Sequence, residues 1–356
     1  MASEHNHLVI MAGGIGSRFW PVSTPTLPKQ FIDALGVGRT FLQQTYDNFA
    51  PLIPQERVWV VTSAAYKDVV REQLPEIPLS NILLEPCRRN TAPCIAYVAW
   101  RIKRQDPKAN LVVTPSDHFI GDKETFRRVV DEALAFTSIS DAIVTLGMQP
   151  TRPETGYGYI QADLSEPSLR NRHIFRVDSF KEKPDLATAM QYLKHKEYYW
   201  NSGIFVWTVH TIVNSIRIYA PEVAEIFEAL FPLLGSAQEQ AAIDSEFPKC
   251  PNISIDYAIL EKADEIFVMP ADFGWSDVGT WSSLLQLADK DANGNAAIGS
   301  GIALYDTHNC IVHTVGEKKV VVQGLDDCIV AEKDGTLLIC KLSEEQRIKD
   351  FSQSTP

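Results

Sequence analysis

The chain has 356 residues, of which 45% are hydrophobic and 22% charged, which is enough for one large globular domain and a smaller one. Its formal net charge of -12 argues against binding to nucleic acid or to an anionic membrane surface, so any phosphate must be held by a local group of cations. No apolar run approaches the roughly 20 residues that span a bilayer. The absence of a signal-peptide pattern, together with six scattered cysteines that form no CxxC pair, predicts a reduced, cytoplasmic protein.

Buried strands and amphipathic helices alternate along most of the chain. Apolar runs predict strands at residues 8–12, 57–62 and 111–114. Apolar residues at three and four spacing predict helices at residues 40–49, 65–74, 92–103 and 123–137. This alternation predicts an α/β fold, with a Rossmann-like, mostly parallel sheet flanked by helices.

From about Gly299 the pattern changes to short β-rich runs separated by turns, and helical periodicity is absent until Glu344. The preceding stretch, 289–296, is rich in Asp, Asn and Gly and is typical of a linker. We therefore expect a catalytic domain at residues 1–288 and a small β domain at 296–356. The β domain resembles a few coils of a short left-handed β-helix.

A glycine-rich turn follows the first predicted strand. It contains Gly13, Gly14, Gly16, Ser17 and Arg18, with Lys29 a short distance after it. Glycines let backbone N–H groups turn toward a phosphate, and the two cations supply charge that an acidic protein otherwise lacks. The turn is neither a P-loop nor a GxGxxG fingerprint, because the residues that close those motifs are missing. A plain strand-to-helix turn is the structural alternative.

Seven segments occur in a fixed order along residues 8–285. They are MAGGIGSRFWPVSTPTLPKQF (11–31), LEPCRRNTAP (84–93), TPSDH (114–118), ETGYGYI (154–160), FKEKP (180–184), WNSGIF (200–205) and WSDVGTW (275–281). Together they resemble the sugar-nucleotide pyrophosphorylases, and within them the bacterial mannose-1-phosphate guanylyltransferases. The resemblance implies an Mg²⁺-dependent enzyme that makes GDP-mannose and pyrophosphate from GTP and mannose 1-phosphate. It also implies a homodimer, and the negative net charge predicts no nucleic-acid or membrane partner.

Two aspartates are candidate metal ligands. Asp117 follows a predicted parallel strand, where ligands bind in open α/β sheets, and Asp277 lies in a distant turn. Two carboxylates suit Mg²⁺, which keeps waters and substrate phosphates as its other ligands. The resemblance points to the same pair. The structural alternatives are a helix cap for Asp117 and a turn former for Asp277.

The remaining roles come from the resemblance. It implies that Arg18 binds the departing phosphates, Lys29 the nucleotide phosphates and Lys183 the sugar phosphate. It places Asn90 and Ala92 near the base, although Asn90 is also a good helix N-cap. It places the sugar against Glu154, Gly158, Glu182 and Asn201.

Neighbouring residues in an extended strand point to opposite sides, so Glu182 and Lys183 can both face one ligand only if the chain kinks before Pro184.

No general base is expected, because an oxygen of the sugar phosphate is itself the nucleophile. The alternatives are a related transferase with another sugar phosphate or another nucleoside triphosphate, and a non-catalytic regulatory homologue. The intact Arg18, Lys29 and Asp117 argue against the last of these.

Overall fold

The computed structural model describes residues 4–168 and 171–353, and contacts divide the chain into two compact units. The first unit comprises Met1–Gly13, Tyr46–Pro115 and Ile120–Trp275. The second comprises Gly14–Thr45, Ser116–Phe119 and Ser276–Pro356. The boundary expected at residues 288–296 therefore lies inside the second unit, which also takes in the glycine-rich turn and Asp117.

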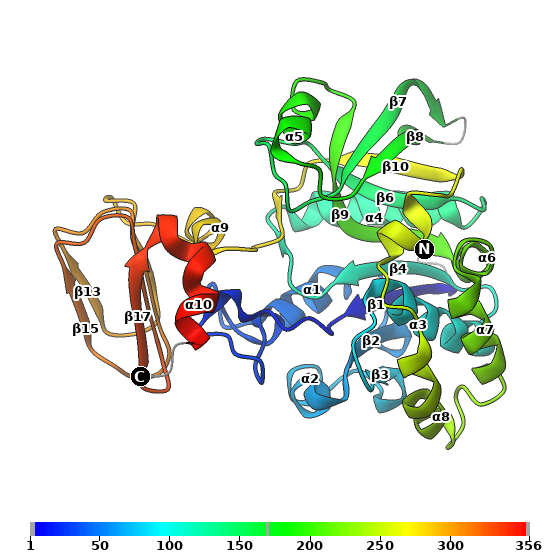
Figure 1. Ribbon diagram of the computed structural model, residues 1–356, viewed down its shortest axis with the longest axis horizontal. Helices are drawn as coiled ribbons and strands as arrows, with labels where there is room; N and C mark the ends of the chain where they lie inside the picture. Colours follow the sequence, from blue (N-terminus) through cyan, green and yellow to red (C-terminus); the bar gives the residue numbers. More distant parts are fainter. Residues whose placement is uncertain (1–3, 169–170, 354–356) are drawn as a thin grey trace. The chain divides into compact units, whose positions relative to one another are not determined.

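The first unit is built on a nine-stranded sheet with the order β3-β2-β1-β4-β9-β6-β10-β8-β7 (Figure 1). Its strands are β1 Asn6–Met11, β2 Val58–Ser63, β3 Ile82–Glu85, β4 Asn110–Pro115, β6 Ile143–Met148, β7 Tyr159–Ser168, β8 Asn171–Lys181, β9 Tyr198–Thr208 and β10 Ile266–Ala271. The strands β3, β2, β1 and β4 are parallel to one another, as are β6 and β10. The antiparallel strand β9 joins the two parallel parts, and β7 and β8 form an antiparallel pair beside β10. The three strands predicted from apolar runs are β1, β2 and β4.

Helices cover both faces of the parallel strands. The helices are α1 Phe41–Phe49, α2 Lys67–Gln73, α3 Thr91–Gln105, α4 Lys123–Thr137, α5 Leu186–Tyr192, α6 Val209–Tyr219, α7 Pro221–Leu230 and α8 Glu239–Glu246. On β4, Leu111 and Val113 join the core cluster that includes α3 and α6, whereas Val112 between them is also fully buried and faces the other side. Because both faces of β4 are buried, its sequence is a continuous run of apolar residues rather than an alternation of apolar and polar ones.

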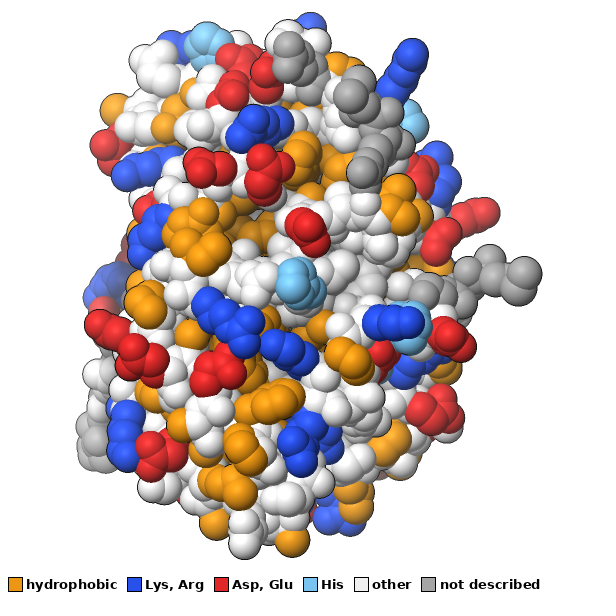
Figure 2. Space-filling view, turned by 90° about the vertical axis from the view of Figure 1, so that its right-hand side faces the viewer, with side chains coloured by type: hydrophobic (Ala, Val, Ile, Leu, Met, Phe, Trp, Pro, Cys, Tyr) orange, Lys and Arg blue, Asp and Glu red, His pale blue; other side chains and the backbone are white. Residues whose placement is uncertain are grey.

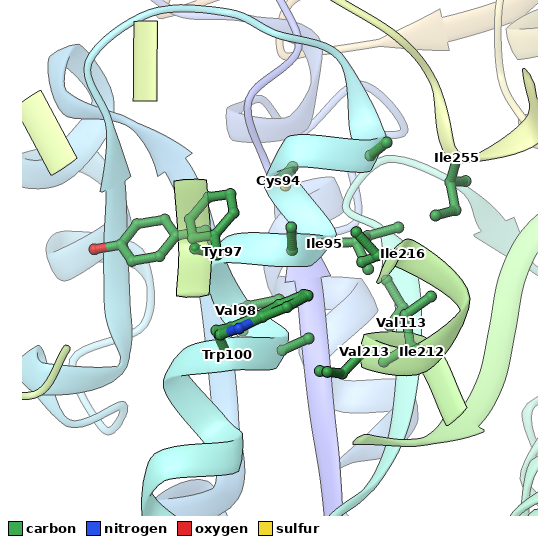
Figure 3. Close-up of a cluster of buried hydrophobic side chains, with 14 of the residues drawn as sticks. Cys94, Ile95, Tyr97, Val98, Trp100, Val113, Ile212, Val213, Ile216 and Ile255 are labelled. Carbon is green, nitrogen blue, oxygen red and sulfur yellow. The ribbon is translucent and has the colours of Figure 1, made fainter. Parts of the chain in front are cut away.

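The core on one side of the sheet is formed where α3 packs against α6 and β4 (Figure 3). The side chains labelled there are Cys94, Ile95, Tyr97, Val98, Trp100, Val113, Ile212, Val213, Ile216 and Ile255. Nearly every side chain of α3 up to Ile102 is buried, so this helix is wrapped by protein rather than lying on the surface. Its first turn carries the NTAP motif and is therefore held firmly.

The second unit contains stacked short strands that form a small β-solenoid. The strands are β12 Ala296–Ile298, β13 Ile302–Tyr305, β14 Ile311–Thr314, β15 Val320–Gln323, β16 Cys328–Lys333 and β17 Thr336–Lys341. The pairings β12–β14, β14–β16 and β13–β15 are parallel, as successive coils require, and β17 ends the stack with an antiparallel pairing. The predicted small β region is confirmed, and the left-handed sense of its coils stays a prediction.

One hydrophobic core explains why the glycine-rich turn belongs with the β-solenoid. Phe19 from that turn meets the ring of Trp281 at 5.2 Å, edge to face. Trp281 begins helix α9 (Trp281–Leu287), and Ile329 of β16 and Phe41 belong to the same buried cluster. Segments far apart in sequence are thus joined into one unit by apolar packing.

None of the helices that the structure describes is long and apolar enough to cross a membrane. On the face drawn in Figure 2, Lys and Arg side chains are interspersed with Asp and Glu, and neither kind covers a broad continuous area. That face therefore lacks the basic surface that binding along nucleic acid requires.

Candidate functional site

The glycine-rich turn is held by the 3-10 turn η2 (Lys29–Phe31). The backbone N–H of Lys29 donates to the carbonyl of Gly16 at 3.2 Å, and the side-chain amide of Gln30 donates to the carbonyl of Gly14 at 2.8 Å. Gly16 has a φ of +33°, and a Cβ there would lie 2.7 Å from the Cβ of Lys29. Glycine is therefore required at position 16. Open space surrounds Gly14, and Ser17 begins the 3-10 turn that contains Arg18.

Lys29 links the two aspartates that the sequence predicts as metal ligands. Its side chain is 5% exposed, and its Nζ lies 3.2 Å from Oδ2 of Asp117 while donating to the backbone carbonyl of Asp277. A buried ammonium group is costly unless it is paired, so these two oxygens determine where the lysine lies. Predicted phosphate-binding and metal-binding residues are thus brought together within the second unit.

The carboxylate of Asp117 is kept ionised by its neighbours. Burial alone would raise the pKa of Asp117, but the charge of Lys29, followed by those of His118 and Arg18, holds this pKa below its ordinary value. Asp117 is not a helix cap, because Asp122 caps the next helix, α4, by accepting from Thr125 N–H. The structural alternative for Asp117 is therefore wrong.

The turn around Asp277 brings its carboxylate close to Arg18. Oδ1 of Asp277 accepts from the N–H of Gly279 at 3.0 Å, so this residue does form a turn. Arg18 Nη1 donates to the Gly279 carbonyl at 3.4 Å. A Cβ on Gly279 would lie 2.7 Å from Asp277 Oδ2 and 3.0 Å from Arg18 Nη1. Glycine at position 279 therefore allows both the carboxylate and the guanidinium to approach the space that a side chain would occupy.

This donor set fits one kind of metal site. Asp117 and Asp277 supply hard carboxylate oxygens, the ligands that Mg²⁺ prefers together with waters and phosphates. Across residues 4–168 and 171–353, no three or more His, Cys, Asp or Glu side chains gather as a metal-binding group. Two carboxylates suit an ion that shares its remaining ligands with a bound phosphate, and they do not suit a closed structural site.

A second cluster of predicted residues lies in the first unit. The N–H of Asn201 donates to the carbonyl of Gly158 at 2.8 Å. A Cβ on Gly158 would lie 2.6 Å from Oε2 of Glu182, so glycine is needed for this carboxylate to approach the backbone. The other oxygen of Glu182 lies 2.9 Å from Nζ of Lys183. The side chain of Glu182 is 9% exposed and that of Lys183 is 60% exposed. Four of the five predicted sugar-binding residues are therefore neighbours.

The kink expected before Pro184 is confirmed. Strand β8 ends at Lys181, and Lys183 has a φ of +45°, which turns both its own side chain and that of Glu182 toward one another. Asn90 and Val278 also have positive φ, at +66° and +47°. This conformation is unfavourable above all for the β-branched Val278, whereas the Asp and Asn residues that adopt it in the solenoid turns tolerate it better. Each of the three residues lies within one of the predicted motifs.

Three predicted residues have other partners. Asn90 caps helix α3, because its side chain accepts from Thr91 N–H at 2.9 Å. The N–H of Ala92 is already donated to the carbonyl of Ile253 at 3.1 Å. Glu154 uses one carboxylate oxygen for Gly156 N–H and the other for Arg152. The observed contacts of Glu154 are therefore with its own loop.

The amide of Asn201 has a fixed orientation. Its oxygen accepts from the hydroxyl of Thr145 at 3.0 Å and from the N–H of Gly203 at 3.2 Å. Its nitrogen donates to Oδ1 of Asp256 at 3.0 Å. Because acceptor and donor ends are both engaged, the amide cannot flip without losing hydrogen bonds.

Asp256 is a member of this cluster that sequence analysis missed. It begins a single π-helical turn, Asp256–Leu260, a feature that often marks functional sites. Burial, followed by the charge of Glu182, raises the pKa of Asp256 to about 6. Its sequence, IDYAIL, resembles an ordinary apolar helix, so no local pattern could have singled it out.

Glu85 is a second missed residue. It ends strand β3, is 6% exposed, and its buried Oε1 has no hydrogen-bond partner within the described part of the chain. A Cβ on Gly13 would lie 3.1 Å from the other oxygen, so the carboxylate lies beside the start of the glycine-rich turn. Burial raises the pKa of Glu85 to about 7, against opposing effects of a hydrogen bond from Cys94 and the charge of Arg88. A carboxylate at the end of an apolar run was the available signal.

Comparison with known proteins identifies the family to which the chain belongs. The profile of the family described as Nucleotidyl transferase matches residues 7–294. The Xanthan biosynthesis protein XanB of Xanthomonas campestris is 37% identical over 345 residues, which are 96% of this chain and 71% of that protein. A mannose-1-phosphate guanylyltransferase of Salmonella montevideo is 37% identical over 353 residues, 96% of this chain and 72% of that protein.

A solved structure resembles nearly the whole chain. The crystal structure described as a mannose-1-phosphate geranyltransferase from Thermus thermophilus has a TM-score of 0.86 and 31% identity, and the match covers 98% of both chains. Enzymes of the matched family generally use a divalent metal, in agreement with the pair of carboxylates. The protein belongs to the nucleotidyl transferase family.

Proposed function

We propose that this protein transfers a guanylyl group from GTP to mannose 1-phosphate, forming GDP-mannose and releasing pyrophosphate. The observation that carries the reaction type is the position of Lys29 between Asp117 and Asp277, beside the glycine-rich turn. This arrangement combines phosphate-binding cations with two carboxylates for a metal ion. The similarity to the Salmonella protein supports the choice of substrates.

The reaction needs alignment and charge neutralisation more than acid–base chemistry. An anionic oxygen of the sugar phosphate attacks the α-phosphorus of GTP and forms a new P–O bond. The bond from the α-phosphorus to the bridging oxygen breaks, and pyrophosphate leaves with that electron pair. Because the attacking oxygen carries no proton, none of the side chains has to act as a general base.

The second unit supplies the positive charge for this step. Arg18 and Lys29 donate to nucleotide phosphates, and Asp117 and Asp277 would hold Mg²⁺, which neutralises charge on the phosphates and polarises the leaving group. The ionised state of Asp117 supports this assignment, since its lowered pKa keeps it a metal ligand throughout the physiological range.

The cluster in the first unit has the composition of a sugar phosphate site. A hydrogen bond and the charge of Glu182 raise the pKa of Lys183 despite the opposing effect of burial, so this lysine stays cationic. We assign Lys183 to the phosphate of the sugar, and Glu182 and the oriented amide of Asn201 to its hydroxyls. Gly158 keeps the backbone close to the ring.

Glu85 gives a physical reason for choosing guanine. Guanine presents adjacent N–H donors at its N1 and 2-amino positions, and a carboxylate can accept both, whereas adenine presents an acceptor at N1. Oε1 of Glu85 has no hydrogen-bond partner among the described residues, and Oε2 lies beside Gly13, and both observations support this pairing. The side chain of Asn90 caps helix α3, and the N–H of Ala92 donates to a backbone carbonyl. These contacts favour a supporting role for both residues rather than direct base recognition.

The test is pyrophosphate release from GTP, ATP, UTP and CTP, each combined singly with mannose 1-phosphate, glucose 1-phosphate and other sugar 1-phosphates. We expect the highest kcat/KM for GTP with mannose 1-phosphate, loss of activity with EDTA and recovery with Mg²⁺. Release that is fastest with another pair would favour a related transferase. A lack of release with every pair, despite nucleotide binding, would favour a non-catalytic homologue.

A further inference from the structure

The carboxy-terminal segment forms one wall of a hollow beside Arg18. The 3-10 turn η8 (Leu342–Arg347) and the helix α10 (Ile348–Gln353) follow the last solenoid strand, and α10 returns to the turn that contains Arg18 (Figure 1). The hollow has a volume of about 100 Å³. Its polar lining comprises Arg18, Gly279 and Thr280 on one side and Glu345, Gln346 and Lys349 on the other. This volume holds several water molecules, so it suits a phosphate group and not a nucleoside.

The segment around Lys349 is anchored, although the side chain of Lys349 is exposed. Ile348, the residue before it, is 2% exposed and belongs to the core cluster of Phe19 and Trp281. Glu345 accepts from the N–H of Ser282 at 2.9 Å at the start of α9. These contacts fix the backbone at position 349 beside Arg18, while the ammonium group has no hydrogen bond or ion pair with any residue in the two described ranges.

The charges of the hollow favour an anion. Arg18 and Lys349 contribute two positive charges and Glu345 one negative charge, so the lining is net positive, and one carboxylate oxygen of Glu345 accepts from the N–H of Ser282. Gly279 also lies in the lining and directly contacts the carboxylate of Asp277, a predicted metal ligand. A phosphate in the hollow would therefore meet two cations and be close to the metal site.

We propose that Lys349 is a third phosphate-binding cation of this enzyme and that, with Arg18, it binds the β and γ phosphates of the nucleotide and then the pyrophosphate product. The inference rests on the proposed function and assigns a role to the small β domain. The solenoid and its terminal helix bring a lysine from the end of the chain to the glycine-rich turn near its beginning. A further cation would stabilise the leaving group, because negative charge accumulates on it as the P–O bond breaks.

The experiment measures binding of inorganic pyrophosphate with MgCl₂ to the full-length protein by calorimetry. We compare wild type with Lys349→Ala, Lys349→Arg and the matched control Lys319→Ala, an exposed lysine on the same unit that lies outside the hollow. Lys349→Ala should raise the Kd for pyrophosphate about tenfold, in the range for losing one charge-assisted hydrogen bond. Lys349→Arg should retain most of the affinity, and Lys319→Ala should match wild type.

Steady-state kinetics give a second measurement. Lys349→Ala should raise the KM for GTP and weaken product inhibition by pyrophosphate, while the KM for mannose 1-phosphate changes less than about twofold, because the lost charge faces only the leaving group. Unchanged melting temperatures confirm that the variants are folded. Pyrophosphate binding by Lys349→Ala that equals that of Lys319→Ala would overturn the inference.

Failure of this inference can be told apart from failure of the proposed function. Pyrophosphate binding requires neither substrate, so Lys349 can be tested even if GTP and mannose 1-phosphate prove to be wrong. If wild type makes GDP-mannose and Lys349→Ala binds pyrophosphate normally, the function stands and the role of Lys349 is refuted. If wild type shows no transfer but Lys349→Ala loses pyrophosphate affinity, the role of Lys349 in binding pyrophosphate stands and the proposed function is refuted.

Discussion

The two units of the chain place carboxylates of the candidate site in opposite electrostatic environments. In the second unit, Asp117 is surrounded by Lys29, His118 and Arg18, and these charges outweigh burial and keep its pKa low. In the first unit, burial dominates, and it raises the pKa of Asp256 to about 6 and that of Glu85 to about 7. The proposed metal ligand Asp117 is thereby kept ionised, whereas the carboxylates proposed for the sugar and base sites change charge near neutral pH.

The same difference has opposite consequences for stability. Asp117 has a lower pKa in the folded protein than in the unfolded chain, so it stabilises the fold above its unfolded pKa and this contribution is lost as pH falls through the folded value. Asp256 and Glu85 have raised folded pKa values, so their ionisation disfavours folding as pH rises from about 4 through those values. The first unit therefore contains carboxylates that reduce stability at neutral pH, a common property of binding sites.

The largest effect is expected from the two carboxylates that we propose as metal ligands. Asp277→Asn should lower kcat by at least about 100-fold, the scale of losing a preorganised electrostatic element, and Asp117→Asn should do the same. The measurement is kcat with GTP and mannose 1-phosphate at saturating Mg²⁺. The control is Asp289→Asn, which changes an exposed aspartate of the same unit and should keep full activity. Full activity in Asp277→Asn would place the metal elsewhere.

A pair of glycine substitutions separates the two clusters. Gly279→Ala would force a Cβ against Asp277 and Arg18, and a displacement of about 1 Å at such a site can cost up to about 100-fold in rate, so kcat should fall and the KM for GTP should rise. Gly158→Ala would press on Glu182 and should raise the KM for mannose 1-phosphate about tenfold with the KM for GTP unchanged. Similar effects of both variants on both substrates would contradict the separation.

Substitutions of Glu182 and Lys183 should have different kinetic effects, although the two side chains contact one another. Lys183→Ala should raise the KM for every sugar phosphate alike and lower kcat, because the lost charge also orients the attacking oxygen. Glu182→Gln should weaken discrimination among hexose 1-phosphates by about 1 to 3 kcal/mol and leave GTP affinity unchanged. The KM values for GTP and two sugar phosphates in both variants decide this. A main effect of Lys183→Ala on GTP would show that the sugar site is misplaced.

The smallest effect concerns Asp256. As pH falls from 7 to 5, Asp256 becomes protonated and its hydrogen bond from Asn201 weakens, so the KM for mannose 1-phosphate should rise several-fold more in wild type than in Asp256→Asn. Asp256→Asn, measured at each pH, is the control. The phosphate of mannose 1-phosphate also changes its protonation with pH, and this change affects both proteins equally. At pH 8, Asp256→Asn should melt at a higher temperature than wild type, and this difference should shrink toward pH 4. Parallel pH profiles for the two proteins would refute the role of Asp256.

Local patterns in the sequence predicted most elements of the amino-terminal part of the sheet and the carboxy-terminal strands, but not the strands and helices between residues 143 and 287. Four predicted helices correspond to α1, α2, α3 and α4, and the five β-rich runs after Gly299 correspond to β13 through β17. Hydrophobic periodicity reports which face of an element is buried, and that information is carried by neighbouring residues. The motif residues Gly158, Glu182, Lys183 and Asn201 were identified in another way, because the segments that contain them resemble motifs of a known family.

Only the tertiary structure decided how these residues act together. The placement of Lys29 between Asp117 and Asp277, the unused oxygen of Glu85 and the π-turn at Asp256 all depend on segments far apart in the chain. A pKa depends on burial and on which charges surround the group, so identical carboxylates acquired opposite shifts that no local pattern encodes. The sequence by itself determined the chemical groups and the elements that hold them, and long-range packing determined which of those groups share one environment.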